Sequence, residues 1–179
     1  MKNNQSTRTS FAAALLTSVL ALGATSAFAA DSGNITIQGT VSPVNELTVT
    51  PQAGYNALDL TSGATEQTVA VVNEKNNDPD GYTVTLVSAN AQAASSSQAR
   101  LKGADTDNAT VVNYSIKYGV AAAEAAVTLD GSGSAVVSST SAASIEAGAD
   151  KNMKITFLGA TWKNADTYSD TLTLTIAAK

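Results

Sequence analysis

The fold class of this chain is decided by Thr171-Leu172-Thr173-Leu174-Thr175-Ile176, a stretch near the C-terminus. Apolar residues alternate with threonine throughout it, and successive side chains of an extended backbone point to opposite faces. The pattern therefore predicts a β-strand with one apolar and one polar face. Tyr168 has the same parity, and Asp170 interrupts the apolar face between them. Because the pattern holds almost to the last residue, we expect this strand to pair deep within a sheet.

The same two-residue period appears directly after residue 33. Asn34–Ser42 predicts a strand whose apolar face carries Ile35, Ile37, Gly39 and Val41. Pro43 interrupts the pattern, which resumes at Leu47 and Val49.

Further segments with strand patterns follow along the chain, separated by clusters of Asn, Asp, Gly and Ser that are typical of turns. The expected strands are Glu66–Val72, Tyr82–Ser88, Val111–Tyr118, Ala125–Leu129, Ser134–Ser138, Met153–Leu158 and Tyr168–Ile176. We expect Ala89–Ala99 to be a loop or a weak edge element, and Ala121–Ala126 fits a short helical turn. Many short strands at this spacing predict an all-β protein, an immunoglobulin-like antiparallel β-sandwich.

The N-terminus has the pattern of a secretory signal peptide. Lys2 and Arg8 precede the uncharged apolar run Phe11–Leu22, which is shorter than the roughly 20 apolar residues of a membrane-spanning helix. Ala27 and Ala29 supply the small residues read by signal peptidase, so cleavage is expected after Ala29 or Ala30. The predicted organisation is a signal peptide at 1–29, an extension at 30–43 and a β-sandwich domain at 44–179. We therefore expect an exported protein with no membrane insertion.

Composition argues against catalysis. The chain has no cysteine and no histidine, which excludes disulfides, Ser-His-Asp and Cys-His relays, and ordinary zinc or copper sites. A hydrolase with a carboxylate pair stays formally open, but the acidic residues are scattered over polar turns. The net charge is −5, and no basic cluster fits nucleic acid. Asp78–Gly81 and Asp105–Asn108 contain calcium-type ligands without the EF-hand spacing. We expect no enzyme activity, cofactor, metal or nucleic-acid partner.

The two ends of the mature chain resemble those of chaperone–usher pilus subunits, and the resemblance is closest to the archaic branch that includes spore-coat-protein-U-like domains. At one end, the alternating Ile35-x-Ile37-x-Gly39-x-Val41 follows the signal peptide at once. At the other end, the segment from Ala165 to Ile176 is similar to the closing strand of many such pilins. The cysteine bridge and the penultimate tyrosine found in many of them are absent here, where residue 178 is Ala.

The resemblance implies a sandwich that lacks its last strand and is completed by a donor strand. Ile35, Ile37, Gly39 and Val41 would enter the groove of a neighbouring copy in a head-to-tail polymer. A periplasmic chaperone would occupy the groove first, and an outer-membrane usher would assemble a surface pilus that supports adhesion or biofilm formation. The side chains expected to contact the chaperone or donor are Tyr168, Leu172, Leu174 and Ile176.

Two alternatives stay open at this stage. Asn34–Ser42 can also pair within its own domain as an ordinary first strand. The protein would then be a monomeric secreted or periplasmic immunoglobulin-like binding module.

Overall fold

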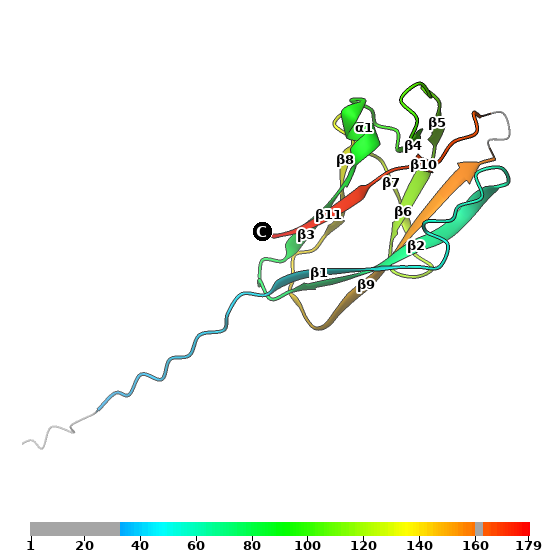
Figure 1. Cartoon of the computed structure of the whole chain (residues 1–179). Helices are drawn as coiled ribbons and strands as arrows, with labels where there is room; N and C mark the ends of the chain where they lie inside the picture. The colour runs from blue at the N-terminus through cyan, green and yellow to red at the C-terminus, as the bar shows by residue number, and fades with distance from the viewer. Residues whose placement is uncertain (1–32, 160–162) are drawn as a thin grey trace, which may run out of the picture. The chain divides into compact units, whose positions relative to one another are not determined.

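A computed structural model of the chain describes residues 33–159 and 163–179 (Figure 1). The expected signal peptide, with Ala27, Ala29 and Ala30 at its cleavage site, lies outside these residues. The chain divides into two units, residues 1–39 and residues 40–179. Among the residues that are described, no helix is both long enough and apolar enough to cross a membrane.

The second unit is built from antiparallel β-strands with one short helix, which confirms the prediction of a mostly β protein. Its elements are β1 (Asn45–Pro51), β2 (Gly63–Asn76), β3 (Tyr82–Ser88), α1 (Ala89–Ala93), β4 (Arg100–Gly103), β5 (Val111–Asn113), β6 (Ser115–Gly119), β7 (Ala125–Val127), β8 (Ser134–Ser139), β9 (Ser144–Leu158), β10 (Tyr168–Ser169) and β11 (Leu172–Ala178).

The strands form two main sheets on one core, an arrangement consistent with a β-sandwich. The larger sheet has the order β1-β2-β9-β6-β7, and the smaller one has the order β11-β3-β8. A third small sheet, β10-β4-β5, lies at one end (Figure 1). Val72, Ile116 and Ile155 of the larger sheet and Leu86 of the smaller one belong to the same buried cluster.

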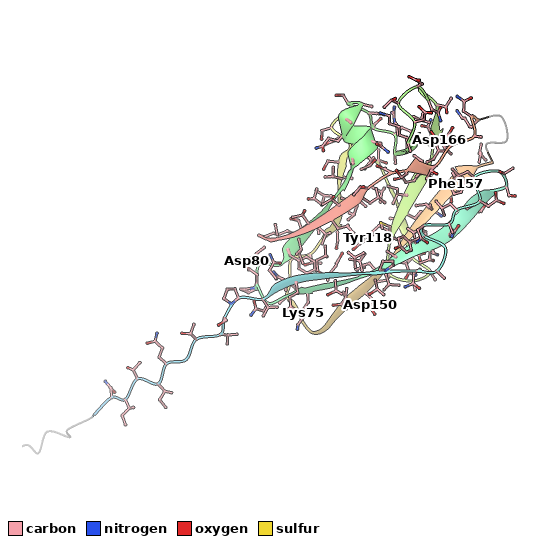
Figure 2. The ribbon with its side chains drawn as sticks, in the orientation of Figure 1. Lys75, Asp80, Tyr118, Asp150, Phe157 and Asp166 are labelled. Carbon is pink, nitrogen blue, oxygen red and sulfur yellow. The ribbon has the colours of Figure 1, made fainter. Side chains whose placement is uncertain are left out.

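A buried carboxylate ties the two main sheets together. Glu74 of β2 is fully buried, and it accepts hydrogen bonds from the hydroxyls of Tyr82 (3.0 Å), Tyr118 (2.7 Å) and Ser138 (2.9 Å). Tyr118 lies between the layers (Figure 2). Burial and the bond to Glu74 raise the pKa of Tyr118 far above its ordinary value, so the phenol stays protonated and donates. The bonds from Tyr82 of β3 and Ser138 of β8 fix the smaller sheet against the larger one, and the bond from Tyr118 of β6 lies within the larger sheet.

Several predicted elements differ from the structure. The expected strand Val111–Tyr118 is divided at Tyr114, and its halves β5 and β6 belong to different sheets. The expected strand Tyr168–Ile176 is divided in the same way at Asp170, into β10 and β11. The prediction that the C-terminal strand pairs deep in a sheet is wrong, because β11 lies at the edge and pairs with β3 alone among the described strands.

The alanine-rich segments also differ from expectation. Ala89–Ala99 begins with the helix α1, because the side chain of Ser88 accepts a hydrogen bond from the Ala91 N–H and caps the first turn. Ala121–Ala126 forms no helix, and its last residues begin β7, which pairs with β6. Composition alone does not reveal that pairing.

The turn between β6 and β7 carries an ionised contact with β9. The Glu124 carboxylate accepts bonds from Lys154 Nζ at 2.8 Å and from Asn152 Nδ2 at 3.0 Å. These two donors lower the pKa of Glu124 from 4.5 to about 2. A carboxyl whose pKa is lowered by folding stabilises the fold above its unfolded pKa, and the contribution disappears as the pH falls through the folded pKa.

We therefore expect Glu124→Gln to lower the free energy of unfolding at pH 7 and to have a much smaller effect near pH 2, because most of the contribution is lost between pH 4.5 and pH 2. Urea unfolding at both pH values measures it. Glu46→Gln is the matched control, because Glu46 pairs with Lys75 at 3.4 Å but its side chain is 63% exposed, and such pairs contribute little. An equal loss for Glu124→Gln at both pH values would contradict the assignment.

Candidate functional site

The candidate site is the space between β1 and β11, the neighbouring edges of the two main sheets. β1 pairs with β2, and β11 pairs with β3; neither has a second partner among the described strands. At one end Asn45 Nδ2 lies 3.5 Å from the carbonyl oxygen of Ile176. At the other end Pro51 and Leu172 line a common hollow. The two strands therefore run in opposite directions along the site.

The hydrogen bonds that flank β1 identify its free edge. The Gln52 N–H donates to Val69 O at 2.9 Å, and Asn77 N–H donates to Val44 O at 3.2 Å. Even-numbered residues therefore bond to β2, because the bonding direction alternates along an antiparallel strand. The N–H and C=O groups of Leu47 and Val49 consequently point to the open side.

The same reasoning applies to β11. Ala89 N–H donates to Thr171 O at 2.9 Å, and Lys179 N–H donates to Gly81 O at 3.1 Å, so odd-numbered residues bond to β3. The N–H and C=O groups of Leu172, Leu174 and Ile176 therefore point away from β3, to the open side. Both edges thus offer a row of groups to an added strand.

The side chains at these edges face the core but remain partly uncovered. Leu47, Leu172 and Leu174 are half-buried and pack against the core cluster, and Val49 is 45% exposed. In a complete sandwich such inward-facing residues are covered by the opposite sheet. Among the residues that the structure describes, none therefore covers this part of the core between β1 and β11.

A hollow of about 290 Å³ opens at this place. Buried core residues form its floor, and the edges and the loop after β1 form its rim. Its apolar lining includes Val49, Tyr55, Leu58, Val69, Leu101, Met153, Ile155 and Leu172. It adjoins a second hollow of about 550 Å³, because Tyr55, Leu58, Leu101 and Asp170 line both. We call the two hollows and the open edges the groove.

Asp170 is a polar residue that lines both hollows of the groove. Its carboxylate accepts bonds from Ser88 Oγ and Tyr114 Oη, both at 2.6 Å, and from the Asn90 N–H at 3.0 Å. Burial and the neighbouring Asp170 carboxylate raise the pKa of Tyr114 above its ordinary value, which keeps the phenol a donor. With its bonds satisfied inside the chain, Asp170 fixes the place where the backbone leaves β10 and begins β11.

The structure brings together only some of the residues singled out from the sequence. Leu172, Leu174 and Ile176 lie on the groove edge as a set. Tyr168 lies on β10 in another sheet, where its hydroxyl accepts a bond from Asn108 Nδ2 at 3.0 Å and donates one to Asn164 O at 2.8 Å. Its assignment to the same strand as Leu172 is therefore wrong, although Tyr168 does line the larger of the two hollows of the groove.

Residues 33–44 form no strand, although alternation predicts one over Asn34–Ser42. Ile35 is 89%, Ile37 94% and Val41 84% exposed. A Cβ added at Gly39 would meet no described atom within 4 Å. We call Asn34–Val41 the N-terminal segment.

Sequence reasoning missed the loop that forms the groove rim. Tyr55, Leu58 and Leu60 follow β1 without a regular period, so no strand or helix pattern marks them. Within the described ranges, no three His, Cys, Asp or Glu side chains are placed to hold a metal ion.

No protein-family model matches the chain, and a search of curated proteins found no significant match.

The groove predicts that replacing Leu86 and Leu174 by alanine lowers the stability by different amounts, although the two leucines are paired on adjacent strands. Leu86 is fully buried, whereas Leu174 opposite it is half-buried. In the monomer isolated by size exclusion we expect Leu86→Ala to cost about 2–5 kcal/mol and Leu174→Ala about 1–2 kcal/mol, since less apolar area is lost at the open edge. Urea unfolding measures both. Equal losses would mean that the edge is covered.

Proposed function

We propose that this protein is a non-catalytic structural subunit of a surface fibre of the pilus or fimbria type, polymerised by strand exchange. In this proposal the domain is an incomplete immunoglobulin-like sandwich, and the N-terminal segment of one copy completes the groove of the next. The observation that carries the proposal is an apolar face that no described residue covers, between two edges that pair with no further described strand. The chain also has a segment of alternating apolar residues, Asn34–Val41, that forms no strand in the structure.

The energetic gains and costs of the exchange are of similar size. Burying Ile35, Ile37 and Val41 contributes on the order of 5–8 kcal/mol together. Backbone hydrogen bonds to the open edges add about 1 kcal/mol each. Ordering the segment costs about 1–2 kcal/mol per residue. The gains from burial and the ladder are therefore of the size needed to offset the ordering of the strand.

Gly39 fits the same role. The chain's own packing gives no reason for glycine at this position, since an added Cβ meets nothing within 4 Å among the described residues. Glycine within a strand allows another backbone to approach closely. A narrow part of a neighbour's groove would supply such a requirement.

The symmetry of the contact leads to a filament. The donor is the N-terminal segment and the acceptor is the groove, so the two surfaces differ. A contact between different surfaces does not close on itself as a two-fold dimer does, and it propagates when the rotation leaves the ring open. Each added copy presents a new groove or a new segment.

The proposal includes export and assisted assembly. A signal peptide at 1–29 would deliver the chain to the periplasm, and its removal would free the N-terminal segment. An exposed apolar sheet edge aggregates readily, which is the physical reason to expect a periplasmic chaperone on the groove and an outer-membrane usher. The resulting fibre would serve adhesion or biofilm formation.

The alternative is a monomeric secreted or periplasmic binding module. Its supporting observation is the hollow of about 550 Å³, lined by the loop from Tyr55 to Thr61 and by Asp166–Asp170, which has the size of a small-ligand pocket. In that case the N-terminal segment has no role in binding, so a substitution within it separates the two functions.

We expect Ile37→Asp to reduce polymer formation at least tenfold, because a carboxylate would replace the apolar side chain buried in the groove. Thr36→Asp is the matched control: its side chain has the opposite parity, so polymers should form as in the wild type. Size exclusion and negative-stain microscopy of the exported protein measure both. Wild-type amounts of filament from Ile37→Asp would contradict strand exchange and favour the monomeric module.

A further inference from the structure

The N-terminal segment and the groove belong to the same chain, which raises the question of which groove the segment enters. A short linker gives an intramolecular partner an effective concentration in the millimolar range. Insertion into the chain's own groove would therefore compete strongly with insertion into a second copy, unless the connection to β1 opposes it.

Parity restricts how the segment can fold back. To lie in its own groove beside β1, the segment must form a hairpin with β1 and still turn Ile35, Ile37 and Val41 toward the core. Leu47 and Val49 are the core-facing residues of β1, so odd-numbered residues must stand opposite odd-numbered ones. The shortest such hairpin pairs Val41 with Asn45 and leaves Ser42, Pro43 and Val44 as a three-residue turn.

The sequence of that turn opposes the hairpin. Three-residue hairpin turns place two residues in the right-handed helical region and the third in the left-handed region. Pro43 in the second position forces Ser42 out of the helical region. Val44 would take the left-handed position, which a β-branched residue avoids. A longer turn that keeps Val41 in the strand would have to include Asn45, which already belongs to β1.

Asn77, in the turn between β2 and β3, forms hydrogen bonds with the backbone of Ser42 and Val44. Asn77 Oδ1 accepts a bond from the Val44 N–H at 2.7 Å, and Asn77 Nδ2 donates to Ser42 O at 2.8 Å. The Asn77 N–H donates to Val44 O at 3.2 Å. One asparagine therefore bonds the backbone on both sides of Pro43 and extends the ladder of β1 and β2. A hairpin turn at Ser42–Val44 would redirect these groups and break the bonds.

We propose that Asn77, together with Pro43 and Val44, prevents the N-terminal segment from entering the groove of its own chain and so reserves the groove for a second copy. The inference rests on the proposed function, and it adds the device that selects an intermolecular partner. Asn77 is a positioning residue in this role, since it acts through the backbone of Ser42 and Val44.

The test compares the exported full chain with the double variant Asn77→Ala/Val44→Gly, which removes the side-chain bonds and permits the left-handed conformation. We expect a loss of polymer of at least tenfold and a monomer whose amides at 34–41 are protected from hydrogen exchange. Asn73→Ala is the matched control: it removes a side-chain amide of β2 that donates to Asp150 at 2.7 Å and stands opposite Thr48 in the β1–β2 ladder. That variant should polymerise like the wild type.

A second variant guards against misfolding of the first. Two glycines inserted between Ser42 and Pro43 preserve parity, leave Val44 and Asn77 unchanged and lengthen the turn, and we expect the same protected monomer. Wild-type polymer yields from both variants, with no protected monomer, would overturn the inference while leaving strand exchange intact. A wild-type chain that forms no polymer removes the proposed function. In that case protection at 34–41 only in the variants still supports the role of Asn77, and its absence everywhere overturns both.

Discussion

β1 and β11 each carry a row of backbone N–H and C=O groups that bond to no second strand among the described residues. The core-facing side chains of these two strands are themselves only partly buried. This constraint organises the molecule. Leu47, Val49 and Leu174 have the parity of core residues, yet Leu47 and Leu174 are only half-buried and Val49 is 45% exposed, because no further strand among the described residues joins the two edges. A strand that enters this groove would bury its apolar side chains and pair the open backbone groups, which stabilises the domain. The proposed assembly rests on that gain in stability.

The sheets are held together at one end of the groove and open at the other. Glu74 stands opposite Leu47 in the β1–β2 ladder, and Tyr82 stands opposite Ala178 in the β3–β11 ladder. The bond between Glu74 and Tyr82 thus ties the sheets close to the place where Asn45 contacts Ile176. The hollow lies toward Pro51 and Leu172, away from this tie. A groove held in shape by buried bonds reduces the ordering cost of binding to the strand that enters it.

The sequence predicted individual strands well where the pattern was local. Tyr82–Ser88 was predicted with the bounds of β3, and Leu47 and Val49 lie in β1. The failures have a common cause, which is that alternation says nothing about which sheet a strand joins. Tyr114 and Asp170 each lie inside a segment that was predicted as one strand, yet each is the point where the chain passes from one sheet to another. Leu172, Leu174 and Ile176 of the β11 edge were singled out from the sequence, whereas the β1 edge and the rim were not, since the loop from Tyr55 to Thr61 has no period.

The sequence by itself determined the β class, the parity of Leu47 and Val49 and of the C-terminal strand, and the absence of histidine and cysteine chemistry, because these depend on residue type and on neighbours along the chain. The tertiary structure alone decided that β11 is an edge strand, that it faces β1 across an uncovered part of the core, and that Asn77 holds the residues on both sides of Pro43. These features depend on contacts between residues far apart in sequence. Residue Asn77 and residue Ser42 are 35 positions apart, and Asn45 and Ile176 are 131 apart. No local period encodes such pairs, and only the pairing of strands in three dimensions brings them together.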